Sequence, residues 1–306
     1  MSNTYILCPG QGAQHGGMGK TFFDASPEAK AVFEDANSVL GFDMATLCFQ
    51  GPEDRLNQTD MCQPAIFVTS VAAHAAAKAA GKLGEGSFVY AGLSLGEYTA
   101  LHLAGVFSFE DGLKLVAARG RFMQEAATAI PSSMVAVMGA DEAQITHLCE
   151  EAQQGEVLVP ANFNAPGQVV VSGSKAACER VTAAASAAGF RAIPLVVAGA
   201  FHSPIMQPAA DKLKAELNAV AFNSPAASVY SNVTAGLHTD PAAIKSLLVD
   251  QLVKPVRWEQ TMAQVANEAD AKFIELAPGK VLTGLLKKQN RRAAIATLNE
   301  AETLKQ

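Results

Sequence analysis

A serine flanked by glycines, in the segment 92–96 (Gly-Leu-Ser-Leu-Gly), constrains the fold more than any other feature of the chain. An apolar run at residues 88–91 precedes it, and an apolar, helix-like stretch through Leu103 follows it. A strand that reverses sharply into a helix needs small residues two positions before and after the turn, because larger side chains would collide with neighbouring elements. The segment therefore predicts a strand–turn–helix unit with Ser94 at the turn.

Such a turn lifts the hydroxyl of Ser94 out of the sheet and points the N–H of Leu95 to where an oxyanion would form. The same motif also occurs in tight turns whose serine is purely structural. The apolar strand before it and the helix after it favour a nucleophile. A serine hydroxyl is a useful nucleophile near neutral pH only when a base lies beside it.

The chain has six histidines, and we expect the base to be one of them. His202 is favoured because it lies in a loop of small and apolar residues, 199–204, at a predicted domain junction. His15 lies near a glycine-rich turn and stays open as an alternative. Helix-like surroundings predict core or surface roles for three others, His74, His102 and His147.

Short apolar segments alternate with helical patterns along most of the chain, which is typical of an α/β protein with a mainly parallel sheet. The strands of this part are predicted at 5–8, 88–91, 228–231 and 272–276. Its helices are predicted at 26–40, 62–82, 110–127, 205–219, 241–252 and 258–269.

A different rhythm begins near residue 130. Strand, helix, strand, strand, helix and strand are predicted at 134–138, 141–154, 157–161, 168–172, 175–188 and 191–197. This is the order of a ferredoxin-like unit. We therefore predict a large α/β-hydrolase-like domain formed by residues 1–128 and 198–306, with a small ferredoxin-like domain, residues 129–197, inserted between its two parts.

Composition argues against several classes of function. The net charge is −6 and no long run of Lys or Arg occurs, which argues against nucleic acid as a partner. No apolar stretch approaches the roughly 20 residues needed to span a bilayer, and no targeting signal is recognisable, so we expect a cytoplasmic protein without a membrane partner. The five scattered cysteines have no metal-site or disulfide spacing, and we expect no metal.

Four segments, in order along nearly the whole chain, together resemble the malonyl-CoA:acyl-carrier-protein transacylases. These are the acyltransferases of fatty-acid synthesis, and they are related to the acyltransferase domains of polyketide synthases. The segments are 9–14, 92–98, 199–202 and 251–258. The resemblance implies a ping-pong reaction in which malonyl-CoA acylates Ser94 and the phosphopantetheine thiol of acyl carrier protein then takes the malonyl group. It implies no cofactor beyond the substrate and the group that the partner carries.

The resemblance also implies roles for individual residues. Ser94 matches the acylated serine, and His202 matches the histidine that takes its proton. The backbone carbonyl of Gln251 matches the group that orients the imidazole, in place of an Asp. The backbone N–H groups of Gln11 and Leu95 match the oxyanion hole.

Other matches concern the substrate. Arg119 matches the residue that pairs with the free carboxylate of the malonyl group, although without the resemblance it would be taken as a surface helix residue with Arg121 as a competitor. Gln63 and Asn164 match recurring family positions that line the pocket or order its loops, and a role in satisfying backbone groups is equally open. Phe201 is a bulky residue that, in the related polyketide enzymes, goes with malonyl over methylmalonyl.

Two positions depart from the family's pattern. Many members carry His directly before the serine, where this chain has Leu93. Malonyl-specific polyketide acyltransferases often have His where this chain has Gly199, a departure that weakens the prediction of malonyl specificity.

We expect acyl carrier protein and a coenzyme A thioester as partners, and a monomeric protein. Carrier proteins of this type are acidic, and this chain is acidic as well, so docking requires a local basic patch. The candidates are Lys280, Lys287, Lys288, Arg291 and Arg292.

Three alternatives stay open: a trans-acting acyltransferase of polyketide synthesis, a serine thioesterase or hydrolase, and a non-catalytic module that kept the fold. A hydrolase would normally have an acid orienting a histidine near the C-terminus. His238 is the one histidine that follows His202.

Overall fold

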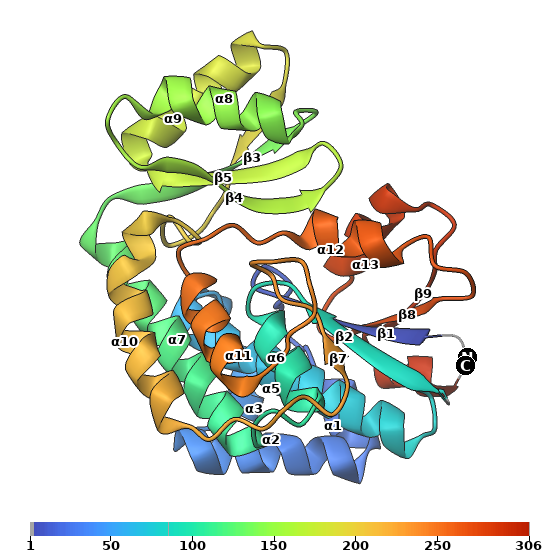
Figure 1. Cartoon of the computed structure of the whole chain (residues 1–306). Helices are drawn as coiled ribbons and strands as arrows, with labels where there is room; N and C mark the ends of the chain where they lie inside the picture. The colour runs from blue at the N-terminus through green and yellow to red at the C-terminus, as the bar shows by residue number, and fades with distance from the viewer. Residues whose placement is uncertain (1–2, 85, 306) are drawn as a thin grey trace.

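The computed structural model describes residues 3–84 and 86–305 and contains two sheets. The larger has five strands in the order β7-β2-β1-β8-β9, and the smaller has four in the order β4-β5-β3-β6. Figure 1 shows the smaller sheet at one end of the molecule, with α8 and α9 on its outer face. This arrangement confirms the predicted fold class.

The larger sheet is parallel throughout. Its strands are β1 (Asn3–Cys8), β2 (Ser87–Gly92), β7 (Ser228–Val229), β8 (Lys272–Leu276) and β9 (Ala294–Leu298). Side chains of β1 alternate between two apolar cores: Ile6 and Cys8 belong to one, whereas Tyr5 and Leu7 belong to the other. A central strand with both faces buried has to be apolar at nearly every position, which is why residues 5–8 are recognisable in the sequence.

Helices cover both faces of the larger sheet (Figure 1). They are α1 (Lys20–Ala25), α2 (Pro27–Leu40), α3 (Met44–Gln50), α4 (Glu53–Leu56), α5 (Thr59–Ala79), α6 (Gly96–Leu103), α7 (Phe109–Ala129), α10 (Gln207–Ala219), α11 (Pro241–Asp250), α12 (Trp258–Val265) and α13 (Val281–Gln289). Two short 3-10 turns lie at Pro204–Met206 and Ala301–Lys305. No helix in the two described ranges is both long and apolar enough to cross a membrane.

The smaller sheet has the predicted strand–helix–strand–strand–helix–strand order. Its elements are β3 (Ser132–Met138), α8 (Glu142–Gln153), β4 (Leu158–Ala165), β5 (Gln168–Ser174), α9 (Lys175–Ala187) and β6 (Arg191–Pro194). All three strand pairs are antiparallel, and the sheet encloses a core of its own with α8 and α9. The domain boundaries at 129 and 197 stay predictions.

Several elements differ from the sequence-based expectation. The helix α13, the edge strand β9 and the short helices α1, α3 and α4 were not predicted, since each is too short to show a clear period. The last strand of the small sheet ends at Pro194 rather than at 197, because its pairing with β3 ends there and Val196 is fully exposed. The helix α12 ends at Val265 rather than at 269, and the segment that follows Val265 is rich in polar residues.

The turn between β2 and α6 depends on two close backbone contacts. A Cβ added at Gly92 would lie 1.9 Å from the carbonyl carbon of Gly96. A Cβ added at Gly96 would lie 2.1 Å from the carbonyl oxygen of Cys8, at the end of β1. Because no real Cβ approaches backbone atoms so closely, the glycines allow α6 to begin directly against the sheet and to hold Ser94 at its edge.

Gly96→Ala should therefore destabilise the protein by about 3 kcal/mol, the upper range for forcing extra atoms into a packed interior. Gly284→Ala is the matched control, because it also adds a methyl group to a glycine within a helix, and the new Cβ would meet no atom within 4 Å. The control should be neutral or stabilising by up to about 1 kcal/mol. Urea denaturation measures both, and equal free energies of unfolding for the two variants would contradict the close-contact argument.

Candidate active site

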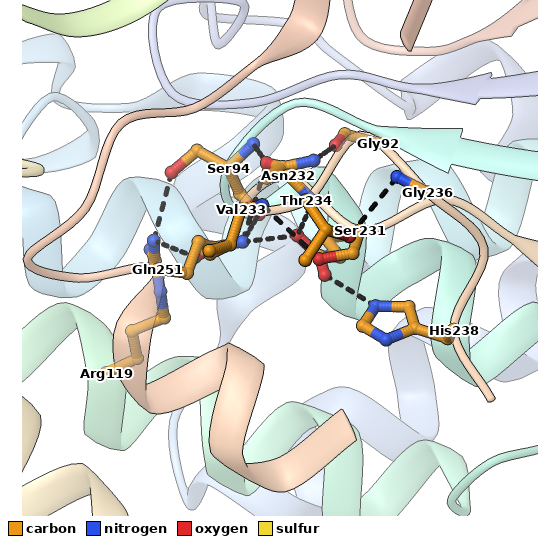
Figure 2. Close-up of polar contacts among 11 residues, drawn as sticks. Gly92, Ser94, Arg119, Ser231, Asn232, Val233, Thr234, Gly236, His238 and Gln251 are labelled. Carbon is orange, nitrogen blue, oxygen red and sulfur yellow. Dashed lines mark hydrogen bonds and ion pairs between the residues drawn. The ribbon is translucent and has the colours of Figure 1, made fainter. Parts of the chain in front are cut away.

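Ser94 has a left-handed backbone, with φ of 53°. The polar groups around it hold this conformation: its N–H donates to Oδ1 of Asn232 at 2.6 Å, and its carbonyl accepts from Nε2 of Gln251 at 3.0 Å. Figure 2 shows both contacts. A left-handed conformation is costly for a residue with a side chain, so these bonds fix the serine where the turn requires it.

His202 lies against the serine hydroxyl. Its Nε2 is 2.8 Å from Oγ of Ser94, and its Nδ1 is 2.6 Å from the carbonyl oxygen of Gln251. Since a carbonyl only accepts, Nδ1 carries the hydrogen, and in the neutral ring Nε2 is left to accept the proton of the serine. The structure thus brings together three of the predicted residues from distant parts of the chain.

The surroundings of His202 favour its neutral form. Burial lowers the pKa of His202 to about 4, and the positive charge of Arg119 acts in the same direction. The bond to the carbonyl of Gln251 opposes this lowering. The ring is therefore ready to accept a proton at any pH well above 4.

Arg119, on α7, is 1% exposed, so the surface position that the sequence alone suggested is wrong. Its guanidinium donates to Oε1 of Gln63 at 2.6 Å, to Oγ of Ser94 at 2.9 Å and to Oε1 of Gln251 at 2.9 Å. All three acceptors are uncharged. Arg121, the competitor, lies at the surface with Glu125 as its ion-pair partner.

No carboxylate within the described ranges forms an ion pair with Arg119. Burial lowers the pKa of this guanidinium, but arginine stays charged at neutral pH. The three neutral acceptors satisfy some of its N–H groups but do not balance its charge, and its buried Nε has no partner among the described residues. The site therefore favours an anionic group beside Ser94.

The two predicted oxyanion donors lie close to Ser94: Leu95 directly follows it in the chain, and Gln11 lies near it in space. The N–H of Leu95 is at the start of α6, and Gln11 lines the same pocket as Ser94. In the part of the chain that the structure describes, neither N–H has an intramolecular acceptor. Both groups are free to donate to a bound substrate, and their role as the oxyanion hole stays a prediction.

A pocket of about 160 Å³ opens at Ser94 and His202. Phe201 and Asn164 line it, as expected, whereas Gln63 lies behind Arg119. The other lining residues come from both sheets and the loops between them: Gln11, Leu93, Met123, Met134, Asn162, Val170, Leu195 and Val197. Ser94 therefore faces a mainly apolar cleft between the two sheets.

The two departures from the family pattern have structural counterparts. Leu93 lines the pocket in the place of the usual histidine. A Cβ at Gly199 would lie 2.6 Å from the Cβ of Ala127, so this backbone has no room for a histidine there.

The remaining histidines have other partners. His15 is exposed, and its ring contacts the carbonyl of Gly16, whereas the histidine beside the hydroxyl of Ser94 is His202. His74 and His102 lie within helices and are largely buried, and His147 pairs with Glu151 at the surface. Residues 3–84 and 86–305 contain no group of three metal-binding side chains.

Three residues of the site were missed by the sequence reasoning: Glu97, Asn232 and His238. Asn232 bonds to the backbone of the turn, and Glu97 bonds to Gln251, Asn232 and His238. Glu97 lies in the segment 92–98 that carried the resemblance. A single carboxylate within the mainly apolar stretch that follows the turn was the signal that the sequence offered.

The chain is similar to known acyltransferases over nearly its whole length. The model of the family described as "Acyl transferase domain" matches residues 4–304. A relative named malonyl CoA-acyl carrier protein transacylase, from Escherichia coli (strain K12), is 42% identical over 305 residues, which cover 99% of this chain and 98% of the relative.

Two solved structures are similar over nearly the whole chain. The malonyl CoA-acyl carrier protein transacylase of Coxiella burnetii has a TM-score of 0.95 and 37% identity, and the match covers 99% of this chain and 96% of that one. A malonyl transacylase solved in complex with a type II polyketide acyl carrier protein has a TM-score of 0.93 and 39% identity, covering 99% and 98%.

The surroundings of His202 predict an unusual pH dependence. The rate at which a fluorophosphonate labels Ser94 should stay constant from pH 8 to about 5 and fall only as the pH approaches about 4, where His202 gains a proton. Arg119→Ala should move the pH at which the labelling rate falls to a higher value, since it removes a positive charge beside the ring and so raises the pKa of His202. If the labelling rate of both proteins instead falls near pH 6.5, the ordinary pKa of histidine, the account is contradicted.

Proposed function

Because the chain belongs to the malonyl CoA-acyl carrier protein transacylase family of acyltransferases, we propose that it transfers a malonyl group from malonyl-CoA to the phosphopantetheine thiol of acyl carrier protein, for fatty-acid synthesis. The observation that carries the choice of substrate is the buried guanidinium of Arg119. It lies 2.9 Å from the nucleophilic oxygen and has only neutral partners among the described residues.

A carboxylate is the group that this guanidinium fits best. Arginine presents parallel N–H donors that match the two oxygens of a carboxylate, and such charge-assisted pairs are stronger than neutral hydrogen bonds. A malonyl group carries its carboxylate one carbon away from the thioester carbonyl. Once that carbonyl is at Ser94, the carboxylate lies within reach of Arg119.

The first half-reaction follows from the contacts of Ser94. Its hydroxyl transfers its proton to Nε2 of His202 as the oxygen attacks the thioester carbonyl. The N–H groups of Gln11 and Leu95 stabilise the negative charge that develops on that carbonyl oxygen, an interaction worth about 3 kcal/mol per donor. The C–S bond then breaks, and coenzyme A leaves with the proton from His202.

The second half-reaction reverses these steps with a new thiol. His202 takes the proton of the phosphopantetheine thiol, whose sulfur attacks the ester carbonyl on Ser94. The ester C–O bond breaks, and the oxygen of Ser94 recovers a proton from His202. Throughout, the carbonyl of Gln251 holds the imidazole, so no carboxylate is needed in the third position.

The hydrolase alternative is disfavoured by the partner of His202. A hydrolase of this kind uses a carboxylate to orient its histidine, whereas Nδ1 of His202 meets a backbone carbonyl. His238 does not serve as a carboxylate-oriented base for Ser94, because its Nε2 is bound to Glu97. A hydrolase of uncharged esters would also gain nothing from a buried guanidinium beside the nucleophile that has only neutral partners among the described residues.

A polyketide carrier protein is the second candidate acceptor. The specific observation in its favour is the structural match to a malonyl transacylase in complex with a type II polyketide carrier protein. Both candidates share the chemistry at Ser94 and differ only in the carrier surface. Transfer assays with holo carrier proteins of each kind distinguish them.

We further propose that the protein acts as a cytoplasmic monomer and without a metal or a bound cofactor.

Two of the five residues in the proposed basic patch already form hydrogen bonds within the protein. Lys287 donates to the carbonyl of Ala293, and Lys288 donates to Gln168. Lys280, Arg291 and Arg292 are exposed and are the better candidates for contact with an acidic carrier.

Intact-mass analysis tests the acyl-enzyme directly. Mixing the protein with malonyl-CoA should add one malonyl group, and holo acyl carrier protein should then remove it. Ser94→Ala should show no addition under the same conditions. A wild-type protein that gains no mass, or a Ser94→Ala variant that still does, would rule out the proposed nucleophile.

Arg119→Ala should lower kcat/KM for malonyl-CoA by at least about 30-fold, which corresponds to about 2 kcal/mol, the low end for losing one partner of a buried, hydrogen-bonded charge pair. Its activity with acetyl-CoA should stay the same or rise, since acetyl has no carboxylate. Arg121→Ala is the control, because it removes the same side chain from the exposed face of the same helix. Malonyl transfer that survives Arg119→Ala would disprove the carboxylate clamp.

A further inference from the structure

A fully buried polar network lies beneath the nucleophile, and the chemistry described above does not use it. Its members are Glu97, Asn232, His238 and the side chain of Gln251, all 8% exposed or less. Figure 2 shows Asn232, Gln251 and His238 arranged around the turn that carries Ser94. Burying so many polar groups has an energetic cost, so a function for the network is expected.

The side chain of Asn232 binds the backbone of the turn at two points. Its Oδ1 accepts from the N–H of Ser94 at 2.6 Å, and its Nδ2 donates to the carbonyl of Gly92 at 2.7 Å. One bond holds the left-handed serine itself, and the other holds Gly92, two residues before it. The side chain of Asn232 therefore fixes the position of the nucleophile without touching its oxygen.

Glu97 holds Asn232 in turn. Its Oε2 accepts from the backbone N–H of Asn232 at 3.0 Å, and its Oε1 accepts from Nε2 of His238 at 2.7 Å. The exposed fractions of the Glu97 and His238 side chains are 1% and 0%. The carboxylate is thus fixed from both sides inside the protein.

The same carboxylate orients the amide of Gln251. Nε2 of Gln251 donates to Oε2 of Glu97 at 2.8 Å, which turns Oε1 of the amide to the guanidinium of Arg119, 2.9 Å away. A carboxylate only accepts and a guanidinium only donates, so the amide between them has one allowed orientation. The amide of Gln251 thus links the carboxylate of Glu97 to the guanidinium of Arg119 through two charge-assisted hydrogen bonds.

Gln251 also holds the catalytic base, because its carbonyl accepts from Nδ1 of His202. Glu97 consequently contacts both supports of the reaction: Asn232, which places Ser94, and Gln251, which places His202 and Arg119. It does so from α6, the helix that begins directly after the turn.

We propose that Glu97 is a positioning residue that sets the distance between Ser94 and His202 through Asn232 and Gln251. The inference rests on the proposed malonyl transfer and adds to it a residue that touches neither the substrate nor the reacting atoms. Glu97→Gln removes the charge and allows the amide at 251 to turn, since a glutamine at 97 can donate as well as accept. The nucleophile and base then lose their fixed alignment, while the pocket keeps its shape.

The test is steady-state malonyl transfer with single-turnover acylation of Ser94. Glu97→Gln should lower kcat about 100-fold, the loss that a misplacement of about 1 Å causes. It should leave KM for malonyl-CoA within about threefold, because the bond to Gln63 still holds Arg119. Asn232→Ala should have a similar effect. The double variant should lose little more than either single one, because residues that act as a unit are not additive.

Glu275→Gln is the matched control. Glu275 is also fully buried on the large sheet, and its carboxylate accepts from the N–H groups of Leu282 and Thr283 at the start of α13. It should lower thermal stability to a similar degree as Glu97→Gln without the loss in kcat. If Glu97→Gln fails to fold, Asn232→Ala decides the matter, since it leaves no buried charge unpaired.

Two results would overturn the inference. A Glu97→Gln or Asn232→Ala protein that folds and keeps kcat within about threefold of the wild type would show that the network only stabilises the fold. A fall in kcat matched by the Glu275→Gln control would show the same. If the wild-type protein itself gains no malonyl group, the proposed function fails and this inference fails with it.

Discussion

The approach of α6 to the end of β1 is the constraint on which the site depends. At Gly96 the helix backbone comes so close to the carbonyl of Cys8 that no Cβ fits between them. This contact forces the chain to reverse at Ser94, with a left-handed backbone, and places the N–H of Leu95 at a helix start. Every later step, from the bond to His202 to the oxyanion donors, uses the position that this turn provides.

A second theme is the placement of charge. Arg119 is buried beside Ser94, and its positive charge lowers the pKa of His202. We expect a carboxylate that binds Arg119 to offset this charge and to make His202 a stronger base. The same substrate group would then be recognised and would help to activate the site, which links specificity to the rate of acylation.

The sequence predicted those parts of the structure that follow from local patterns. The turn at 92–96 requires glycines, and the order of elements in 134–197 is that of a ferredoxin-like unit. Local patterns could not predict contacts between residues that are far apart in the sequence. Glu97 and His238 are 141 positions apart, and only folding brings their side chains together. The burial of Arg119 likewise depends on packing between helices, so that family resemblance, not its own pattern, identified it.

The most direct measurement is a crystal structure of the protein frozen after reaction with malonyl-CoA. The account predicts a malonyl ester on Oγ of Ser94, with its carboxylate on the guanidinium of Arg119 and its carbonyl oxygen between the N–H groups of Gln11 and Leu95. His202 should keep its bond to the carbonyl of Gln251. An acyl group on another residue, or a carboxylate directed away from Arg119 into the open cleft, would contradict the central claim.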